Sequence, residues 1–135
     1  MKQGDKKKRQ PSGFTFRELS TRTLPDFERL LETHPAPGAY SCWCLFNHHA
    51  GPEDWSGTTR EINARNRREK RALVAKGCSH GIIAYAQGEP VGWCQYGRAE
   101  ELPRVDSRPG YERSSPADTT TLWRITCFVV ARQYR

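Results

Sequence analysis

The sequence predicts an α/β domain in which helices flank a mixed, mostly antiparallel sheet. Two runs rich in β-branched and aromatic residues, 82–86 and 91–96, flank the turn sequence QGEP and should pair as an antiparallel hairpin. Two other segments predict helices, one from apolar residues at helical spacing and the other from good helix formers between a cap and a glycine. A nearly continuous apolar run, LWRITCFVVA at 122–131, is typical of a central strand that is buried on both faces.

The first elements follow from periodicity. The segment FTFRELS, which begins at Phe14, alternates apolar and polar residues and predicts a half-buried strand. In TLPDFERLLETHPAPG, apolar residues recur at spacings of three and four, and Pro25 suits a first helical turn. We expect a short amphipathic helix there, with Thr23 as its cap and with Pro35 and Pro37 ending it.

The middle of the chain combines an aromatic segment with a second helical pattern. The segment AYSCWCLFNHHAGPEDWSG, residues 39–57, predicts a strand or extended stretch that leads into a loop. Residues 58–77 predict a helix, because Thr58 or Thr59 can cap it, Glu61 stands in its first turn and Gly77 follows its end. A single helical turn at 99–102 and then a loop are expected after the hairpin.

Length and charge limit the possible classes of protein. A chain of 135 residues suits one domain, and 22 Lys and Arg against 15 Asp and Glu favour phosphate-bearing ligands or nucleic acid without choosing between them. We expect residues 1–13 to form a basic, flexible tail and residues 14–135 to form the domain. No segment has the apolar length of a membrane span or of a secretory signal, so we expect a cytoplasmic protein without a membrane partner.

The cysteines predict reduced thiols rather than a disulfide framework. They are odd in number, and three of them lie inside apolar, strand-like runs. The five are Cys42, Cys44, Cys78, Cys94 and Cys127. Cys42 and Cys44 with His48 and His49 invite a zinc interpretation, but a C-x-C pair leaves little room for tetrahedral ligation and no second pair has finger-like spacing. We expect no metal.

Two segments, GIIAYAQGEPVGWCQYGR and LWRITCFVVARQYR, resemble the GCN5-related N-acetyltransferases. In that superfamily a hairpin with a G-E-P-V-G type turn precedes a central strand that ends in an F-V-x-x-x-x-Y-R pattern. The matching residues here are Phe128, Val129, Tyr134 and Arg135. The resemblance covers most of the chain from Phe14 and implies the amino-terminal part of the acyl-CoA N-acyltransferase fold, truncated after the central strand.

The resemblance also implies a reaction, in which acetyl-CoA donates an acetyl group to a primary amine of a small molecule or peptide. The backbone of Phe128, Val129 and Val130 would pair with the pantetheine arm as another strand would. Arg135 would begin a pyrophosphate-binding loop, which family members continue with glycines. Because those glycines are missing here, we expect weak or absent acetyl-CoA binding, little activity, and self-association through the exposed last strand.

The catalytic residues remain open. Glu100 and Glu101 follow the hairpin and could accept the proton of the amine, although solvated surface charge is the simpler interpretation. Cys127 could carry an acyl group, but an apolar strand disfavours its thiolate and members of the superfamily usually transfer directly, so we expect a core role. Three aromatic residues either line an acceptor pocket or pack in the core: Trp43, Phe46 and Trp55.

A basic module that binds nucleic acid or an acidic partner is the alternative function. Its support is a run of basic residues in the predicted helix: Arg60, Arg65, Arg67, Arg68, Lys70, Arg71 and Lys76. Glu61 and Glu69 interrupt this run and nothing resembles a base-reading motif, so a solvated helix face is the simpler interpretation.

Overall fold

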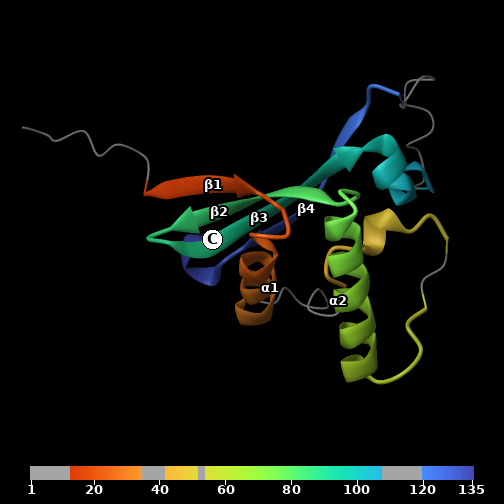
Figure 1. The fold of residues 1–135 in the computed structure, drawn as a ribbon, viewed down its shortest axis with the longest axis horizontal. Helices are drawn as coiled ribbons and strands as arrows, with labels where there is room; N and C mark the ends of the chain where they lie inside the picture. Colours follow the sequence, from red (N-terminus) through yellow and green to blue (C-terminus); the bar gives the residue numbers. More distant parts are fainter. Residues whose placement is uncertain (1–12, 35–41, 52–53, 108–119) are drawn as a thin grey trace, which may run out of the picture.

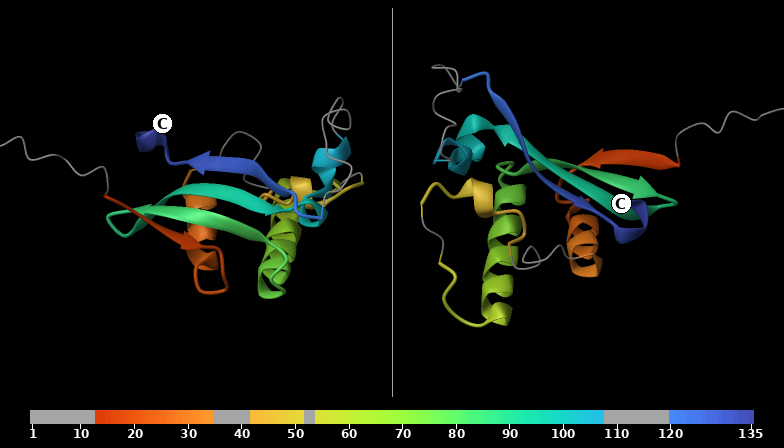
Figure 2. Two further views of the ribbon diagram at one scale, coloured as in Figure 1. Left: turned by 90° about the horizontal axis from the view of Figure 1, so that it is seen from above. Right: turned by 180° about the vertical axis from the view of Figure 1, so that it is seen from behind.

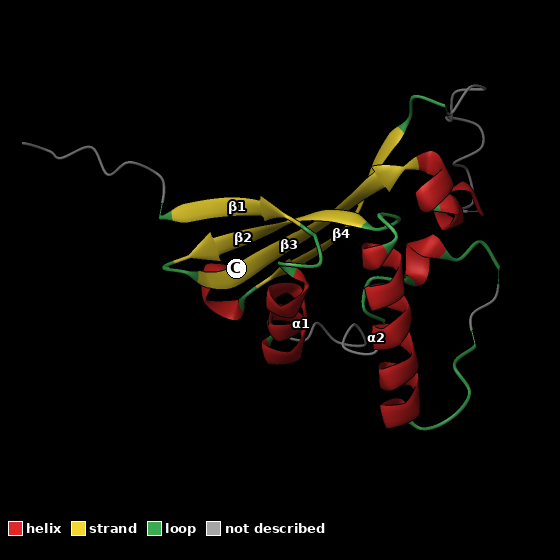
Figure 3. Cartoon of the chain, viewed as in Figure 1, coloured by secondary structure: helices red, strands yellow, loops and turns green. Residues whose placement is uncertain are grey.

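The computed structural model describes residues 13–34, 42–51, 54–107 and 120–135. Within this part, four strands form one sheet in the order β1-β2-β3-β4, and two helices, α1 and α2, lie on one of its faces (Figure 1, Figure 3). The views from above and behind show that the opposite face carries neither helix (Figure 2). The α/β class is therefore confirmed, although every strand pair is antiparallel and the described sheet is not mixed.

The strands lie where the sequence places them. They are β1 (Phe14–Glu18), β2 (His80–Ala86), β3 (Glu89–Arg98) and β4 (Trp123–Val130). The predicted hairpin is β2 with β3, and its turn consists of two residues whose φ angles, 51° at Gln87 and 79° at Gly88, lie in the left-handed region. A two-residue turn with this backbone matches the twist of the strands that it joins.

The second helix begins at a capping box. In α2 (Thr59–Ala75), the hydroxyl of Thr58 accepts a hydrogen bond from the Glu61 N–H at 3.2 Å. The Glu61 carboxylate in turn accepts one from the Thr58 N–H at 2.7 Å. Both donors would otherwise lack partners at a helix start, so the predicted cap is confirmed, with Thr58 rather than Thr59 in that role.

The first helix, α1 (Leu24–Thr33), is confirmed, but its cap differs from the prediction. Thr23 occupies the cap position without a capping hydrogen bond. Its hydroxyl donates instead to the Glu18 carbonyl at 2.8 Å, which fastens the helix start to the end of β1. Pro35 and Pro37 lie outside the described residues, which leaves the predicted helix stop untested.

Residues 42–51 form turns and a short 3₁₀ helix, Phe46–His48, so the expected strand is not found in this stretch. The φ angles of Trp43 and Cys44 are 52° and 57°, which no strand residue adopts. The helical turn expected after β3 is confirmed at Ala99–Glu101, and a further short helix, Pro103–Ser107, stands where a loop was expected.

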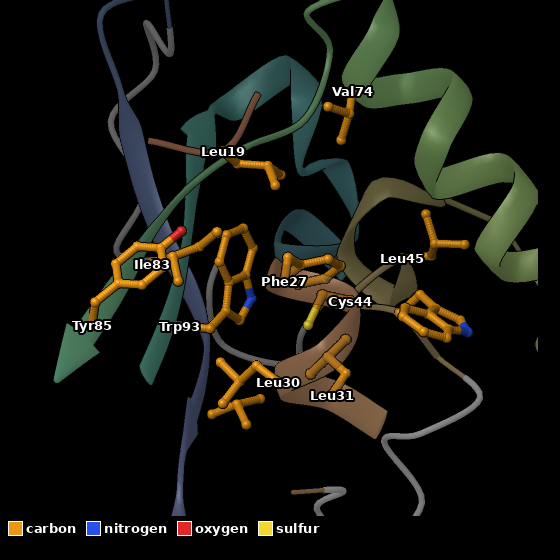
Figure 4. Packing of buried hydrophobic residues seen from close by; sticks show 12 residues of the cluster. Leu19, Phe27, Leu30, Leu31, Cys44, Leu45, Val74, Ile83, Tyr85 and Trp93 are labelled. Atoms are coloured by element: carbon orange, nitrogen blue, oxygen red, sulfur yellow. The ribbon is translucent and has the colours of Figure 1, made fainter. Parts of the chain in front are cut away.

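The core lies between α1, α2 and the covered face of the sheet. Phe27, Leu30 and Leu31 of α1 pack against Ile83 and Trp93 of the hairpin (Figure 4). The rings of Phe27 and Trp93 lie 4.5 Å apart between centroids, in a tilted arrangement typical of aromatic pairs. These contacts fix α1 directly beneath β3.

The last strand is buried on one face only, so the prediction of burial on both faces is wrong. Val129 faces the helices with 3% of its surface exposed, whereas Ile125 and Phe128 on the bare face are 67% and 66% exposed. Among the described strands, only β3 pairs with β4, which places β4 at the sheet edge. The opposite edge strand, β1, is exposed along its whole length instead of half-buried.

A β-bulge interrupts β4. Gln95 of β3 lies opposite Cys127 and Tyr96 lies opposite Ile125, so Thr126 has no partner position of its own. The Thr126 hydroxyl donates to the Gln95 side-chain oxygen at 3.0 Å on the covered face of the sheet. Two consecutive residues, Thr126 and Cys127, therefore point toward the helices, as an extra residue in a strand permits.

Candidate functional site

The residues predicted to bind the cofactor lie together at the C-terminal end of β4. The side chains of Phe128 and Val130 are exposed, whereas that of Val129 is packed in the core and its backbone groups point toward β3, opposite Trp93. After β4 the chain turns through a short 3₁₀ helix, Arg132–Tyr134. This turn brings the Arg135 side chain back onto the strand, where Nε donates to the Val130 carbonyl at 2.8 Å.

A hollow of about 430 Å³ lies beside this end of β4. Its lining residues come from the end of α1 and from the C-terminal turn: Thr33, His34, Arg132, Gln133 and Arg135. Two arginines and no Asp or Glu side chain line the hollow among the described residues, so these side chains suit an anionic group such as a phosphate.

A second cavity, of about 260 Å³, lies between the 42–51 segment and α2. Phe46 and Trp55 line it, whereas the Trp43 ring is buried and donates from Nε1 to the Asn63 side-chain oxygen at 2.8 Å. Phe46 and Trp55 therefore fit the interpretation as pocket lining, whereas Trp43 fits the interpretation as core packing. Among the described residues, the lining consists of Cys42, Leu45, Phe46, His49, Asp54, Trp55, Arg65, Asn66 and Glu69.

Charged side chains pair with one another around this cavity. His49 Nε2 lies 2.9 Å from a Glu69 carboxylate oxygen, and Arg65 lies 3.8 Å from the Asp54 carboxylate. The hydrogen bonds that Ser56 gives to Asp54 lower the pKa of that carboxyl group. The cavity therefore presents two carboxylates beside two aromatic rings.

A buried polar network lies behind the bulge. Gln95 donates to the Cys44 carbonyl at 2.8 Å, and its nitrogen lies 3.1 Å from His48 Nε2, which is also 3.3 Å from the Ser79 hydroxyl. Burial, followed by the nearby charge of Lys70, lowers the pKa of His48 to about 4. His48 is therefore neutral at pH 7. A glutamine inside an apolar strand was the one sequence signal for this network.

The two candidate glutamates differ in their surroundings. Glu100 is exposed and lies 3.9 Å from Arg98, so the interpretation as surface charge holds for it. The Glu101 side chain is largely buried, and its carboxylate lies 2.8 Å from His80 Nδ1. Surface solvation therefore does not describe Glu101.

Two cysteines and a lysine meet between the sheet and the helices. The sulfur atoms of Cys44 and Cys127 are 3.2 Å apart. Lys70, expected on a solvated face, is only 1% exposed, and its ammonium lies 5.2 Å and 5.5 Å from the ring centroids of Phe27 and Trp93. All five cysteines are free in the structure, and Cys78 is exposed.

The thiolate of Cys127 is favoured, which corrects the expectation from its apolar strand. The hydrogen bond from Cys44 outweighs burial and, together with the charge of Lys70, lowers the pKa of Cys127 to about 7. The same hydrogen bond and burial raise the pKa of Cys44.

The basic side of α2 is partly neutralised. Arg67 and Arg71 both bind the buried Glu28 carboxylate of α1, at 2.7 Å and 2.6 Å, and Arg67 also binds Glu32 at 2.8 Å. Burial disfavours the charge of Glu28, but the hydrogen bonds from the two arginines outweigh it and lower the pKa to about 2. The basic residues of α2 that are exposed and make none of these pairs are Arg60, Arg68 and Lys76.

The histidines considered for zinc have protein partners. His48 belongs to the buried network and His49 to the second cavity. Across the described ranges, no group of three or more His, Cys, Asp or Glu side chains is arranged to hold a metal ion. None of the described helices has the length and apolar character needed to cross a membrane.

Comparison of the chain with protein-family models, curated proteins and solved structures finds no match. Support for a function therefore comes from the sequence motifs, the C-terminal end of β4 and the two cavities described above.

Proposed function

We propose that this chain carries the chemistry of an N-acetyltransferase, the transfer of an acetyl group from acetyl-CoA to a primary amine, in the cytoplasm. The observation that supports the proposal is that the outer edge of β4 leads directly to the hollow lined by Arg132 and Arg135. In the described residues no strand lies beyond that edge, so the backbone groups that point away from β3 can pair with an extended ligand, apart from the Val130 carbonyl, which Arg135 occupies. Arg135 stands where that ligand would carry its phosphates.

The direction of the ligand follows from these two features. With its pyrophosphate in the hollow, the pantetheine arm would run along β4 from Val130 toward the bulge at Thr126. Four residues of strand span about 13 Å at ~3.3 Å per residue. The thioester would then lie beside the bulge, next to Cys127, which contacts Cys44 of the 42–51 segment.

The second cavity suits the acceptor. A primary amine is a cation at pH 7, and a cation is attracted both by carboxylates and by aromatic faces. Asp54 and Glu69 supply the carboxylates, and Phe46 and Trp55 supply the rings. Before it can attack the thioester, the amine must lose a proton, which a lining carboxylate can accept directly or through water.

The test is binding of two ligands that differ only in their phosphates and nucleotide. Acetyl-CoA and S-acetylpantetheine are titrated into the isotope-labelled chain, and the amide signals of Phe128, Val129 and Val130 are followed by NMR. We expect both ligands to shift these signals at millimolar concentration. The affinity should be modest, because strand pairing along one edge supplies few contacts.

The variant Arg135→Gln separates the phosphate contact from the strand contact. It should weaken acetyl-CoA binding by roughly 10- to 150-fold, since a charge-assisted hydrogen bond contributes roughly 1.5–3 kcal/mol, and leave S-acetylpantetheine binding unchanged. Arg98→Gln, the same change at the far end of the sheet, is the matched control and should alter neither. Unshifted β4 amides, or equal acetyl-CoA affinity in the two variants, would contradict the proposal. Acetylation of a panel of primary amines, read by mass spectrometry, then tests the reaction.

The alternative role in nucleic-acid binding has less support, because three of the six basic side chains on α2 pair with carboxylates and a fourth, Lys70, is buried. Salt-dependent binding of a random oligonucleotide, together with unshifted β4 amides, would favour it.

A further inference from the structure

We propose that Cys44 and Cys127 form a reversible disulfide in response to a small peroxide, with Lys70 as the counter-charge of the reactive thiolate. The bond would tie the 42–51 segment covalently to β4. This inference does not depend on the acetyltransferase proposal, because it uses only the interior between the sheet and α2.

The two sulfur atoms need little movement to react. They lie 3.2 Å apart, and a disulfide bond is about 2.05 Å long, so an approach of roughly 1 Å suffices. Two features of the Cys44 backbone fix its position. Its φ angle is in the left-handed region, and its carbonyl accepts a hydrogen bond from the buried Gln95 at 2.8 Å. The bulge at Thr126 turns Cys127 toward it.

Lys70 explains why a thiolate would form in this interior. Its Nζ atom is buried and has no hydrogen-bond partner within the described part of the chain. An isolated buried ammonium is costly, and the two aromatic faces beside it compensate only in part. Cys127 supplies an anion at this place, and its lowered pKa of about 7 reflects the Cys44 hydrogen bond first and the Lys70 charge after it.

Exposure and pKa assign different roles to the two sulfurs. Cys127 is partly exposed at the sheet edge, whereas Cys44 is buried and its pKa is raised. The thiolate is the reacting form of a cysteine, so Cys127 is the sulfur that meets the oxidant and Cys44 the one that resolves the product. Cys78 is exposed on the connection between α2 and β2 and takes no part.

The steps balance with hydrogen peroxide as the oxidant. The Cys127 thiolate attacks one peroxide oxygen, the O–O bond breaks, and the departing hydroxide takes up a proton to leave as water, which gives a sulfenic acid. The Cys44 sulfur then attacks the sulfenic sulfur, the S–O bond breaks, and the departing hydroxide takes the Cys44 proton as a second water. Two thiols and one peroxide thus become one disulfide and two waters. A small dithiol reverses the change by thiol–disulfide exchange.

The test uses the full chain treated with hydrogen peroxide at pH 7, followed by alkylation of the remaining thiols. Intact mass and peptide mapping without reduction should show one intramolecular link that joins the Cys44 and Cys127 peptides, and dithiothreitol should remove it. Cys78→Ser is the matched control and should form the same link at the same rate. In Cys44→Ser, whose hydroxyl can still donate a hydrogen bond to Cys127, Cys127 should accumulate as a sulfenic acid that a dione reagent traps.

Lys70→Met tests the role of the Lys70 ammonium, because methionine carries no charge and leaves no unpaired charge in the interior. If proximity alone drove the reaction, this variant would oxidise as fast as the parent chain. We expect oxidation at pH 7 to slow by about tenfold or more, because loss of the ammonium lowers the thiolate fraction. A link from Cys127 to Cys42, or an unmodified Cys127 at a peroxide concentration that consumes Cys78, would overturn the proposal. Both of these outcomes are measured in the parent chain and do not depend on the folding of a variant.

Discussion

Replacing Glu28 with glutamine measures how firmly α1 is held to α2. The Glu28 side chain is 8% exposed and accepts hydrogen bonds from Arg67 at 2.7 Å and from Arg71 at 2.6 Å and 3.0 Å. Glutamine keeps the size of the side chain but loses its charge and one acceptor oxygen. The two arginines would then face a neutral partner beneath them.

The pKa of Glu28 sets the expected loss. It falls from an ordinary value of 4.5 to about 2, and one pKa unit corresponds to about 1.4 kcal/mol, which gives roughly 3 kcal/mol. Arg71 is half-exposed and therefore screened by water, so we expect about 2 kcal/mol at pH 7. Because the folded-state pKa is the lower one, this stabilisation is complete above about pH 5 and is lost as the pH falls through 4.5 toward 2.

Urea unfolding of both chains between pH 2 and pH 7 gives the measurement. Glu32→Gln is the matched control, since Glu32 binds Arg67 at 2.8 Å but its side chain is 51% exposed, and it should cost less than ~1 kcal/mol. The difference between Glu28→Gln and the parent chain should shrink as the pH falls from 5 to 2. Equal losses in the two variants, or a Glu28→Gln defect that persists undiminished at pH 2, would refute the reasoning.

Two further predictions concern the sheet. Ile125→Lys places a charge on the bare face of the edge strand β4. We expect this change to reduce self-association of the chain, measured by sedimentation velocity, with little change in stability. Undiminished self-association would show that the contact between chains lies elsewhere. Gly81→Ala puts a Cβ atom against the Trp93 ring and 2.7 Å from the Cys94 carbonyl oxygen, and should lower the free energy of unfolding by at least ~2 kcal/mol. Gly51→Ala, which meets nothing within 4 Å, is its control, and similar effects of both changes would show that close packing is not the cause.

The sequence predicts those elements whose signals are local. The hairpin of β2 and β3 depends on a turn of two residues, Gln87 and Gly88, between runs of strand-forming residues. The start of α2 depends on Thr58 and Glu61, three positions apart. In each case the residues that stabilise the element lie close together in the chain, so the sequence alone indicates both partners.

The site depends on contacts between distant residues, which the sequence does not display. Lys70 belongs to a run of charged residues, and only the packing of α1 and β3 around it makes it buried. Cys44 and Cys127 are 83 residues apart, and neither shows its partner in its own segment. The apolar run of β4 correctly indicates a strand, but apolar character alone does not say whether a second layer covers its outer face.

The bulge in β4 determines which side chains of the strand face the interior. Side chains along a regular strand alternate between faces, so the residue that follows Ile125 and Thr126 would ordinarily share the bare face with Ile125. One surplus residue, Thr126, reverses this alternation, and Cys127 and Val129 face inward while Phe128 faces outward. The Cys127 side chain therefore faces Cys44 because the strand contains one extra residue before it. The face toward which Cys127 points depends on the presence of a residue at position 126 and not on the type of that residue.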